Sequence, residues 1–149
     1  MPTELLGEVP DRALAIFAHP DDSDVAAGGT LARWAGEGCE VHVVICALGD
    51  KGSSKIGEDV TQLVERRAQE LQAAQKILGV REIHQLSYPD GELENDLALR
   101  RELVIIIRSF RPEVMICPDP TAVFFGEHYF NHHDHRSVGF AALDAASPA

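Results

Sequence analysis

The fold of this chain is decided by one stretch of sequence, Ala13-Leu14-Ala15-Ile16-Phe17-Ala18-His19-Pro20-Asp21-Asp22. Its apolar part, residues 13–18, is too short for an ordinary helix and predicts a strand that is buried on both faces. The apolar run stops at His19-Pro20, where such a strand would reach the edge of its sheet. Strands buried on both faces belong to parallel sheets covered by helices, so this stretch predicts an α/β protein.

The rest of the chain continues the alternation of strands and helices. Further strands are predicted at 41–47, which is rich in β-branched residues, at the weaker segment 82–87, and at 114–117. Helices are predicted at 31–37, 58–78, 96–110 and 134–146, with Gly28-Gly29 as a tight turn before the first helix and loops at 48–57 and 121–133. We therefore expect a three-layer Rossmann-like α/β fold, with helices on both faces of a mostly parallel sheet, and a single domain over residues 1–149.

Composition and charge exclude several classes of protein. The 149 residues carry a formal net charge of −11, whereas nucleic acids and anionic membrane surfaces attract clusters of Lys and Arg. The longest apolar runs fall far short of the ~20 residues that span a bilayer. Residues 1–12 lack the pattern of a signal peptide. The cysteines are odd in number, lack metal-ligand spacing and are expected to be reduced thiols. These features predict a cytoplasmic protein that binds neither nucleic acid nor membranes.

Four segments that are candidates for a functional site follow the four predicted strands. In a doubly wound sheet, ligands bind beyond the carboxyl ends of the strands. The His19-Pro20-Asp21-Asp22 motif follows the first strand, and the loop 48–57 follows the second. The turn Tyr88-Pro89-Asp90 follows the third strand, and the loop that leads to His132 follows the fourth. We therefore expect one shared site at the C-terminal edge of the sheet.

The residue types in two of these segments are those of a catalytic metal site. His19 and Asp22 are three residues apart across a turn and can reach one ion, and His135 can supply a third ligand. Two imidazoles and one carboxylate leave a zinc ion one open position, as catalytic zinc sites require.

Neighbouring residues suit the remaining steps of a hydrolysis. Asp21 lies beside the ligands and is a candidate general base for deprotonating the metal-bound water. His132, three residues before His135, can donate a hydrogen bond to the developing oxyanion. Asp134 can orient His132 or an adjacent imidazole. By themselves, the residues indicate metal-assisted hydrolysis.

Other interpretations of the chain stay open. A metal- or sugar-binding module without catalysis would need the same ligands. A nucleotide-binding α/β domain would need only the fold, although the sequence has no G-x-G-x-x-G or Walker pattern. His42 and His84 are expected to be packing or surface residues, and Asp24 is expected to lie at a helix start.

Taken together, the motifs resemble those of the PIG-L/LmbE-like family of zinc-dependent N-acetylglucosaminyl deacetylases. The resemblance runs from about Leu14 to the C-terminus. It rests on His19-Pro20-Asp21-Asp22, Gly28-Gly29-Thr30-Leu31, Arg67 with Glu70 ahead of Leu78-Gly79-Val80, Tyr88-Pro89-Asp90-Gly91, Arg111-Pro112-Glu113-Val114, and Asn131-His132-x-Asp134-His135 leading into Gly139.

The resemblance implies a role for each site residue. Zinc, or another divalent transition metal, would be held by His19, Asp22 and His135. The general base would be Asp21, and the acid or oxyanion stabiliser would be His132, assisted by Asp134. The sugar hydroxyls would be held by Arg67 and Asp90. The implied reaction is hydrolysis of the N-acetyl group of a small N-acetylglucosamine-type substrate, which gives acetate and a free amine.

The sequence also departs from the family pattern. His133 stands where the family usually has Pro and adds an imidazole that can compete for metal, while Asp24 stands where Glu is usual. The chain is shorter at its C-terminal end than family members generally are, so the metal site is expected to be more complete than the substrate cleft. A shortened sheet would leave an unpaired edge, which favours a homo-oligomer.

Overall fold

The chain folds around one parallel sheet, seen in a computed structural model that describes residues 7–147. Its four strands lie in the order β3-β2-β1-β4. Their bounds are Arg12–Phe17 for β1, Glu40–Ala47 for β2, Glu82–Tyr88 for β3 and Val114–Ile116 for β4. All four predicted strands are therefore confirmed. Residues 1–6, which belong to the segment where no signal peptide is expected, lie outside the described residues.

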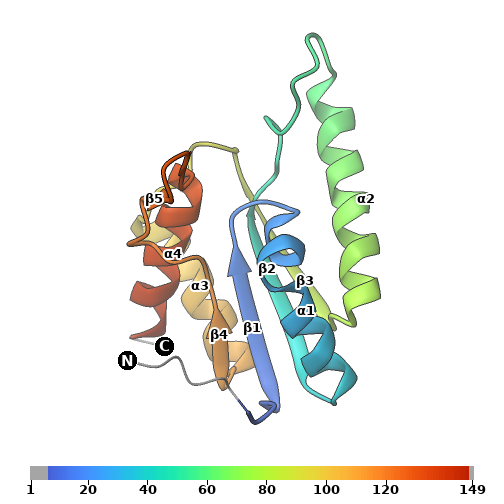
Figure 1. Ribbon diagram of the computed structural model, residues 1–149, viewed down its shortest axis with the longest axis vertical. Helices are drawn as coiled ribbons and strands as arrows, with labels where there is room; N and C mark the ends of the chain where they lie inside the picture. The colour runs from blue at the N-terminus through green and yellow to red at the C-terminus, as the bar shows by residue number, and fades with distance from the viewer. Residues whose placement is uncertain (1–6, 148–149) are drawn as a thin grey trace.

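Helices cover both faces of the sheet, so the predicted three layers are confirmed (Figure 1). The helices α1 (Asp22–Gly36) and α2 (Val60–Leu78) pack together on one face. The helices α3 (Leu97–Phe110) and α4 (His133–Ala146) pack together on the other. Within residues 7–147, no helix is both long enough and apolar enough to cross a membrane.

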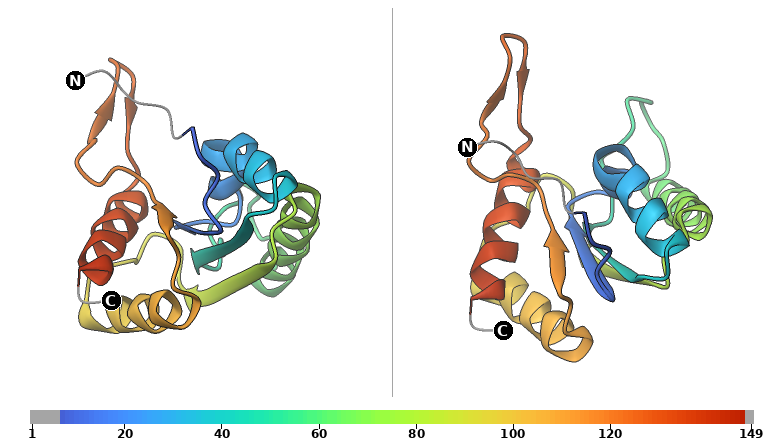
Figure 2. Two further views of the ribbon diagram at one scale, coloured as in Figure 1. Left: turned by 90° about the horizontal axis from the view of Figure 1, so that it is seen from below. Right: turned by 60° about the horizontal axis from the view of Figure 1, so that its bottom comes forward.

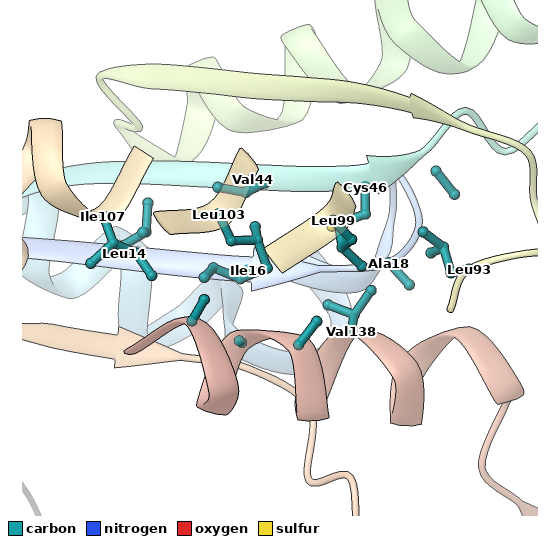
Figure 3. Packing of buried hydrophobic residues seen from close by; sticks show 14 residues of the cluster. Leu14, Ile16, Ala18, Val44, Cys46, Leu93, Leu99, Leu103, Ile107 and Val138 are labelled. Atoms are coloured by element: carbon teal, nitrogen blue, oxygen red, sulfur yellow. The ribbon is translucent and has the colours of Figure 1, made fainter. Parts of the chain in front are cut away.

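Alternate residues of the central strands build two separate hydrophobic cores. On β1, Leu14 and Ile16 pack with apolar residues of α3 and α4, as Figure 3 shows. Ala13, Ala15 and Phe17 point to the opposite face and pack with apolar residues of α1 and α2. Both faces of β1 are fully covered, which explains why its sequence is a continuous apolar run instead of an alternating one.

The first helix begins earlier than predicted. We expected Gly28-Gly29 to form a tight turn, but both residues lie inside α1, which starts at Asp22. Each glycine costs about 1 kcal/mol of helix propensity relative to Ala, and packing overrides that cost here. Gly28 is buried, and a Cβ placed on it would lie 3.7 Å from the side chain of Leu78. Asp24, in the first turn of the helix, lies at a helix start as expected.

The segment 121–133 is not only a loop. It contains an antiparallel hairpin of two short strands, β5 (Phe124–Phe125) and β6 (Tyr129–Phe130), that projects from the body of the molecule (Figure 2). The four aromatic side chains of the hairpin are exposed. Two-residue strands carry no periodicity that sequence patterns can register, which is why the hairpin was not predicted.

Candidate metal centre

The carboxyl edge of the sheet brings the predicted site segments together. Gly49 follows β2 with a φ of +70°, and a Cβ on it would lie 3.1 Å from the ring of Pro20. A glycine there lets the loop after β2 approach the His19-Pro20 turn closely, in a backbone conformation that other residues rarely adopt. After β3, the backbone N–H of Asp90 donates to Oδ1 of Asp50, from the same loop after β2, at 2.8 Å.

Three of the predicted ligands form a compact triangle of donor atoms. Nδ1 of His19 lies 3.2 Å from Nε2 of His135 and 3.3 Å from Oδ2 of Asp22. Nε2 of His135 lies 3.2 Å from Oδ1, the other carboxylate oxygen of Asp22. Ligands held 2.0–2.2 Å from a tetrahedral zinc ion are about 3.3 Å apart. The spacing and chemistry of this donor set therefore fit such an ion.

The other face of the His19 imidazole is held by carboxylates. Nε2 of His19 lies 3.1 Å from Oδ2 of Asp134 and 3.3 Å from Oδ1 of Asp90. Asp134 is fully buried and also accepts hydrogen bonds from the backbone N–H groups of Gly91 at 2.7 Å and Leu93 at 3.3 Å. The sequence left open which imidazole Asp134 orients, and in the structure its carboxylate contacts His19 and not His132. This contact directs Nδ1 of His19 toward the ligand triangle.

Asn131 orients the second imidazole, and sequence reasoning assigned it no role. Its buried side chain places Oδ1 3.1 Å from Nδ1 of His135, which can donate to it. The amide nitrogen of Asn131 donates to the carbonyl oxygens of Ala122 at 2.9 Å and Asp119 at 3.3 Å. The available signal was the spacing of four residues between Asn131 and His135 around the start of α4. Metal-binding histidines commonly have such a partner on the second ring nitrogen.

The cluster strongly favours positive charge. Burial alone would lower the pKa of His19, but the carboxylates of Asp22, Asp90 and Asp134 outweigh burial and raise it to about 9. Burial alone would raise the pKa of Asp22, but hydrogen bonds from His135 and His19 hold it far below its usual range. The carboxylates gathered at this edge thus attract a cation, whether a proton or a metal ion.

Two predicted residues form an ion pair at the rim of the site. Oδ1 of Asp21 lies 3.0 Å from Nη2 of Arg67, and the Asp21 side chain is 59% exposed, so it is open to solvent beside the mostly buried triangle. Nε of Arg67 is buried without a hydrogen-bond partner. Asp21 and Arg67, predicted as general base and sugar-binding residue, therefore lie against each other.

His132 caps α4 and packs against the ligands. Its ring centroid is 5.0 Å from that of His19 in an edge-on arrangement. Nδ1 of His132 accepts a hydrogen bond from the backbone N–H of Asp134 at 3.3 Å. In the neutral ring, this contact leaves the proton on Nε2, which is then available as a donor. The neighbouring His133 is exposed and contacts Glu94 and Ser137, so its imidazole does not join the ligand triangle.

A pocket of about 490 Å³ opens beside the triangle. Asp22 and His135 form part of its wall, and Val25, Phe125 and Tyr129 supply apolar lining. The lining residues do not include Arg67 or Asp90, which were predicted to hold substrate. The aromatic hairpin therefore contributes to the space next to the ligands, a contribution that the sequence did not suggest.

Comparison with protein families and known relatives identifies the proteins that this chain is similar to. Residues 14–146 match the family model PIG-L, described as GlcNAc-PI de-N-acetylase. The chain is 34% identical to diacetylchitobiose deacetylase from Thermococcus kodakarensis, over 91% of this chain and 49% of that protein. It is 32% identical to 1D-myo-inositol 2-acetamido-2-deoxy-alpha-D-glucopyranoside deacetylase from Rhodococcus jostii, over 93% of this chain and 55% of that protein.

A solved structure shares the fold. The N,N'-diacetylchitobiose deacetylase from Pyrococcus horikoshii, complexed with its inhibitor MPG, superimposes with a TM-score of 0.86 and 31% sequence identity. The match covers 93% of this chain and 50% of that one. The chain thus spans about half the length of these relatives.

Proposed function

The chain belongs to the PIG-L family, and from this premise we propose that it is a zinc-dependent N-deacetylase acting on a small N-acetylglucosamine-type substrate. The observation that carries the proposal is the triangle of His19, Asp22 and His135, in which each pair of residues has donor atoms 3.2–3.3 Å apart, with both carboxylate oxygens of Asp22 taking part. The relatives named as deacetylases of acetylated amino sugars support the choice of substrate class.

The proposed metal ion would be held by Nδ1 of His19, a carboxylate oxygen of Asp22 and Nε2 of His135. When bound, zinc lowers the pKa of water and polarises the carbonyl group that is attacked. Asp134 and Asp90 hold His19 from behind, and Asn131 holds His135, so the nitrogen atoms face the ion before it arrives. Such prior orientation reduces the cost of assembling the site.

Asp21 is proposed to take the proton of the attacking water. Its exposed carboxylate follows His19 by two residues and precedes Asp22, so it reaches the same space from the side open to solvent. Arg67 holds the carboxylate in place through the ion pair. The water oxygen bonds to the acetyl carbon as its proton passes to Asp21, and Asp21 then returns this proton to the amide nitrogen as the C–N bond breaks, which releases the free amine and acetate.

His132 is proposed to donate from Nε2 to the oxyanion that develops on the acetyl oxygen. The backbone hydrogen bond to Nδ1 supports oxyanion stabilisation over proton donation by an imidazolium, because an imidazolium would place a second proton against the Asp134 N–H. Arg67 at the rim, and Asp90, which also contacts His19, remain proposed contacts for sugar hydroxyls.

The test is Asp21→Asn, with acetate release from N-acetylglucosamine and N,N'-diacetylchitobiose measured in the presence of zinc. A lost general base lowers turnover by roughly 10²- to 10⁴-fold, while zinc content stays unchanged because Asp21 is outside the triangle. Asp144→Asn, a change of an exposed carboxylate on α4, is the matched control and should retain full activity. Equal turnover in Asp21→Asn and the wild type would refute the proposed base.

A second candidate is a metal- or sugar-binding module without catalysis. The observation that favours it is the pocket beside the triangle, because its lining includes neither Arg67 nor Asp90, the residues expected to hold the sugar. In that case zinc or the sugar would bind, and acetate release would be absent from the wild type itself.

A further inference from the structure

A second group of metal-ligand side chains lies at the opposite, amino-terminal end of the sheet. His42 of β2 pairs in register with Glu82 of β3, and Val44 pairs with His84. Side chains two residues apart on a strand share a face, so His42, Glu82 and His84 project from the same face of the sheet. This is the face covered by α3 and α4. None of these three residues contributes to the metal centre described above.

The distance between the two imidazoles of this cluster equals that in the first triangle, while the distances to the carboxylate are longer. Nδ1 of His42 lies 3.2 Å from Nε2 of His84, close to the spacing between two ligands of a tetrahedral zinc ion. The carboxylate of Glu82 lies 3.9 Å from Nδ1 of His42 and 3.7 Å from Nδ1 of His84. One ligand atom from each of the three residues lies within 4.8 Å of the others. Glu82 is 57% exposed, so its carboxylate has the freedom to close the remaining gap.

The buried imidazole of this cluster is already oriented for a metal ion. His42 is 6% exposed, and its ring stacks on Phe110 of α3 with centroids 3.7 Å apart and an interplanar angle of 11°. Nε2 of His42 lies 3.1 Å from Oε1 of Glu40 and can donate to it. That hydrogen bond leaves Nδ1 unprotonated and facing His84. A carboxylate on the second ring nitrogen is the usual support of a metal-binding histidine.

We propose that His42, His84 and Glu82 bind a second divalent transition-metal ion of the zinc class. Two imidazoles and one carboxylate suit such an ion, whereas calcium and magnesium prefer ligands that are all oxygen. The ion joins β2 to β3, which is the last strand on its side of the sheet within residues 7–147. Its role is structural, because Glu40, the nearby carboxylate, is engaged in holding His42.

The experiment counts zinc ions in the His19→Ala variant, which lacks the first site and therefore isolates the second. Metal-free protein is titrated with zinc against a chromogenic chelator, and folding is checked by circular dichroism. His19→Ala should bind about one equivalent of zinc, and His19→Ala/His84→Ala should bind none. His19→Ala/His128→Ala, which removes an exposed histidine at the tip of the hairpin, is the matched control and should retain one.

Stability supplies a second readout that does not depend on activity. Zinc at 100 times its dissociation constant should raise the Tm of His19→Ala by roughly 5 °C or more, and His84→Ala should abolish that shift. Glu82→Gln changes an exposed side chain with little risk to folding and should weaken zinc binding at least tenfold. This variant replaces His84→Ala in the test if His84→Ala does not fold. The proposal is wrong if His19→Ala binds no zinc. It is also wrong if one equivalent of zinc still binds to His19→Ala with unchanged affinity after either His84→Ala or Glu82→Gln is added.

Discussion

The two ends of the sheet carry the same ligand set in different settings. At each end, two imidazoles have nitrogen atoms 3.2 Å apart and share a carboxylate. At the carboxyl edge the ligands come from a turn, a helix start and α4, whereas at the amino edge they come from neighbouring strands. The carboxyl-edge cluster also has two further polar residues next to its ligands, Asp21 and His132, and a pocket of about 490 Å³ beside it. Two imidazoles and a carboxylate are sufficient to bind a metal ion. Catalysis also requires groups such as Asp21 and His132, and a pocket for the substrate.

The variants His19→Ala and His84→Ala should separate the two clusters most sharply. His19→Ala removes a proposed ligand of the carboxyl-edge site and is expected to lower deacetylation by roughly 10³-fold or more, because both water activation and carbonyl polarisation depend on the proposed ion. His84→Ala alters only the amino edge and should leave turnover within about twofold. Steady-state acetate release at saturating zinc is the measurement. Equal losses in both variants would mean that the two ends do not act independently.

Asp134→Asn tests how much the support behind His19 contributes. Asn cannot accept from Gly91, Leu93 and His19 as the carboxylate does, so the orientation of Nδ1 should loosen. Loss of such support typically weakens metal affinity by about 10- to 100-fold. Competition with a zinc chelator measures the effect, with the amino-edge site removed by His84→Ala. An unchanged affinity would show that Asp90 alone is sufficient to hold His19.

Gly139→Ala should disturb the carboxyl edge through the backbone. A Cβ at Gly139 would lie 2.5 Å from the carbonyl oxygen of Pro118 and 3.1 Å from Pro120, so α4 would have to move away from the end of β4. Overpacking of this kind costs about 1–3 kcal/mol in the free energy of unfolding. Urea denaturation measures it, and zinc binding at the amino edge should persist.

The matched control for this prediction is Gly29→Ala. A Cβ at Gly29 meets no atom within 4 Å, and the residue lies inside α1. The added methyl group should therefore stabilise the protein by about 0.5–1 kcal/mol through helix propensity. If both alanine variants lose the same stability, the close approach of α4 to β4 does not explain the loss in Gly139→Ala.

Much of the fold was predictable because buried parallel strands have a local signature. The continuous apolar run of β1 and the β-branched residues of β2 identify buried strands, and the order of elements then places His19, Asp90 and His132 at one edge. The start of α1 was predicted wrongly, because Gly28-Gly29 has low intrinsic helix propensity and only the packing of α1 on α2 overrides it. The predicted oligomer and the roles of Arg67 and Asp90 in binding substrate stay predictions.

The sequence by itself determined the layers of the fold, and it predicted a site at the carboxyl edge of the sheet from residue types able to bind a metal ion. These depend on local apolar patterns and on a general rule of parallel sheets. Only the tertiary structure decided that Asp134 supports His19, that Asn131 supports His135, and that His42 meets His84 across two strands. Such contacts depend on strand register and side-chain rotamers, which residues far apart in the chain settle together when the layers pack.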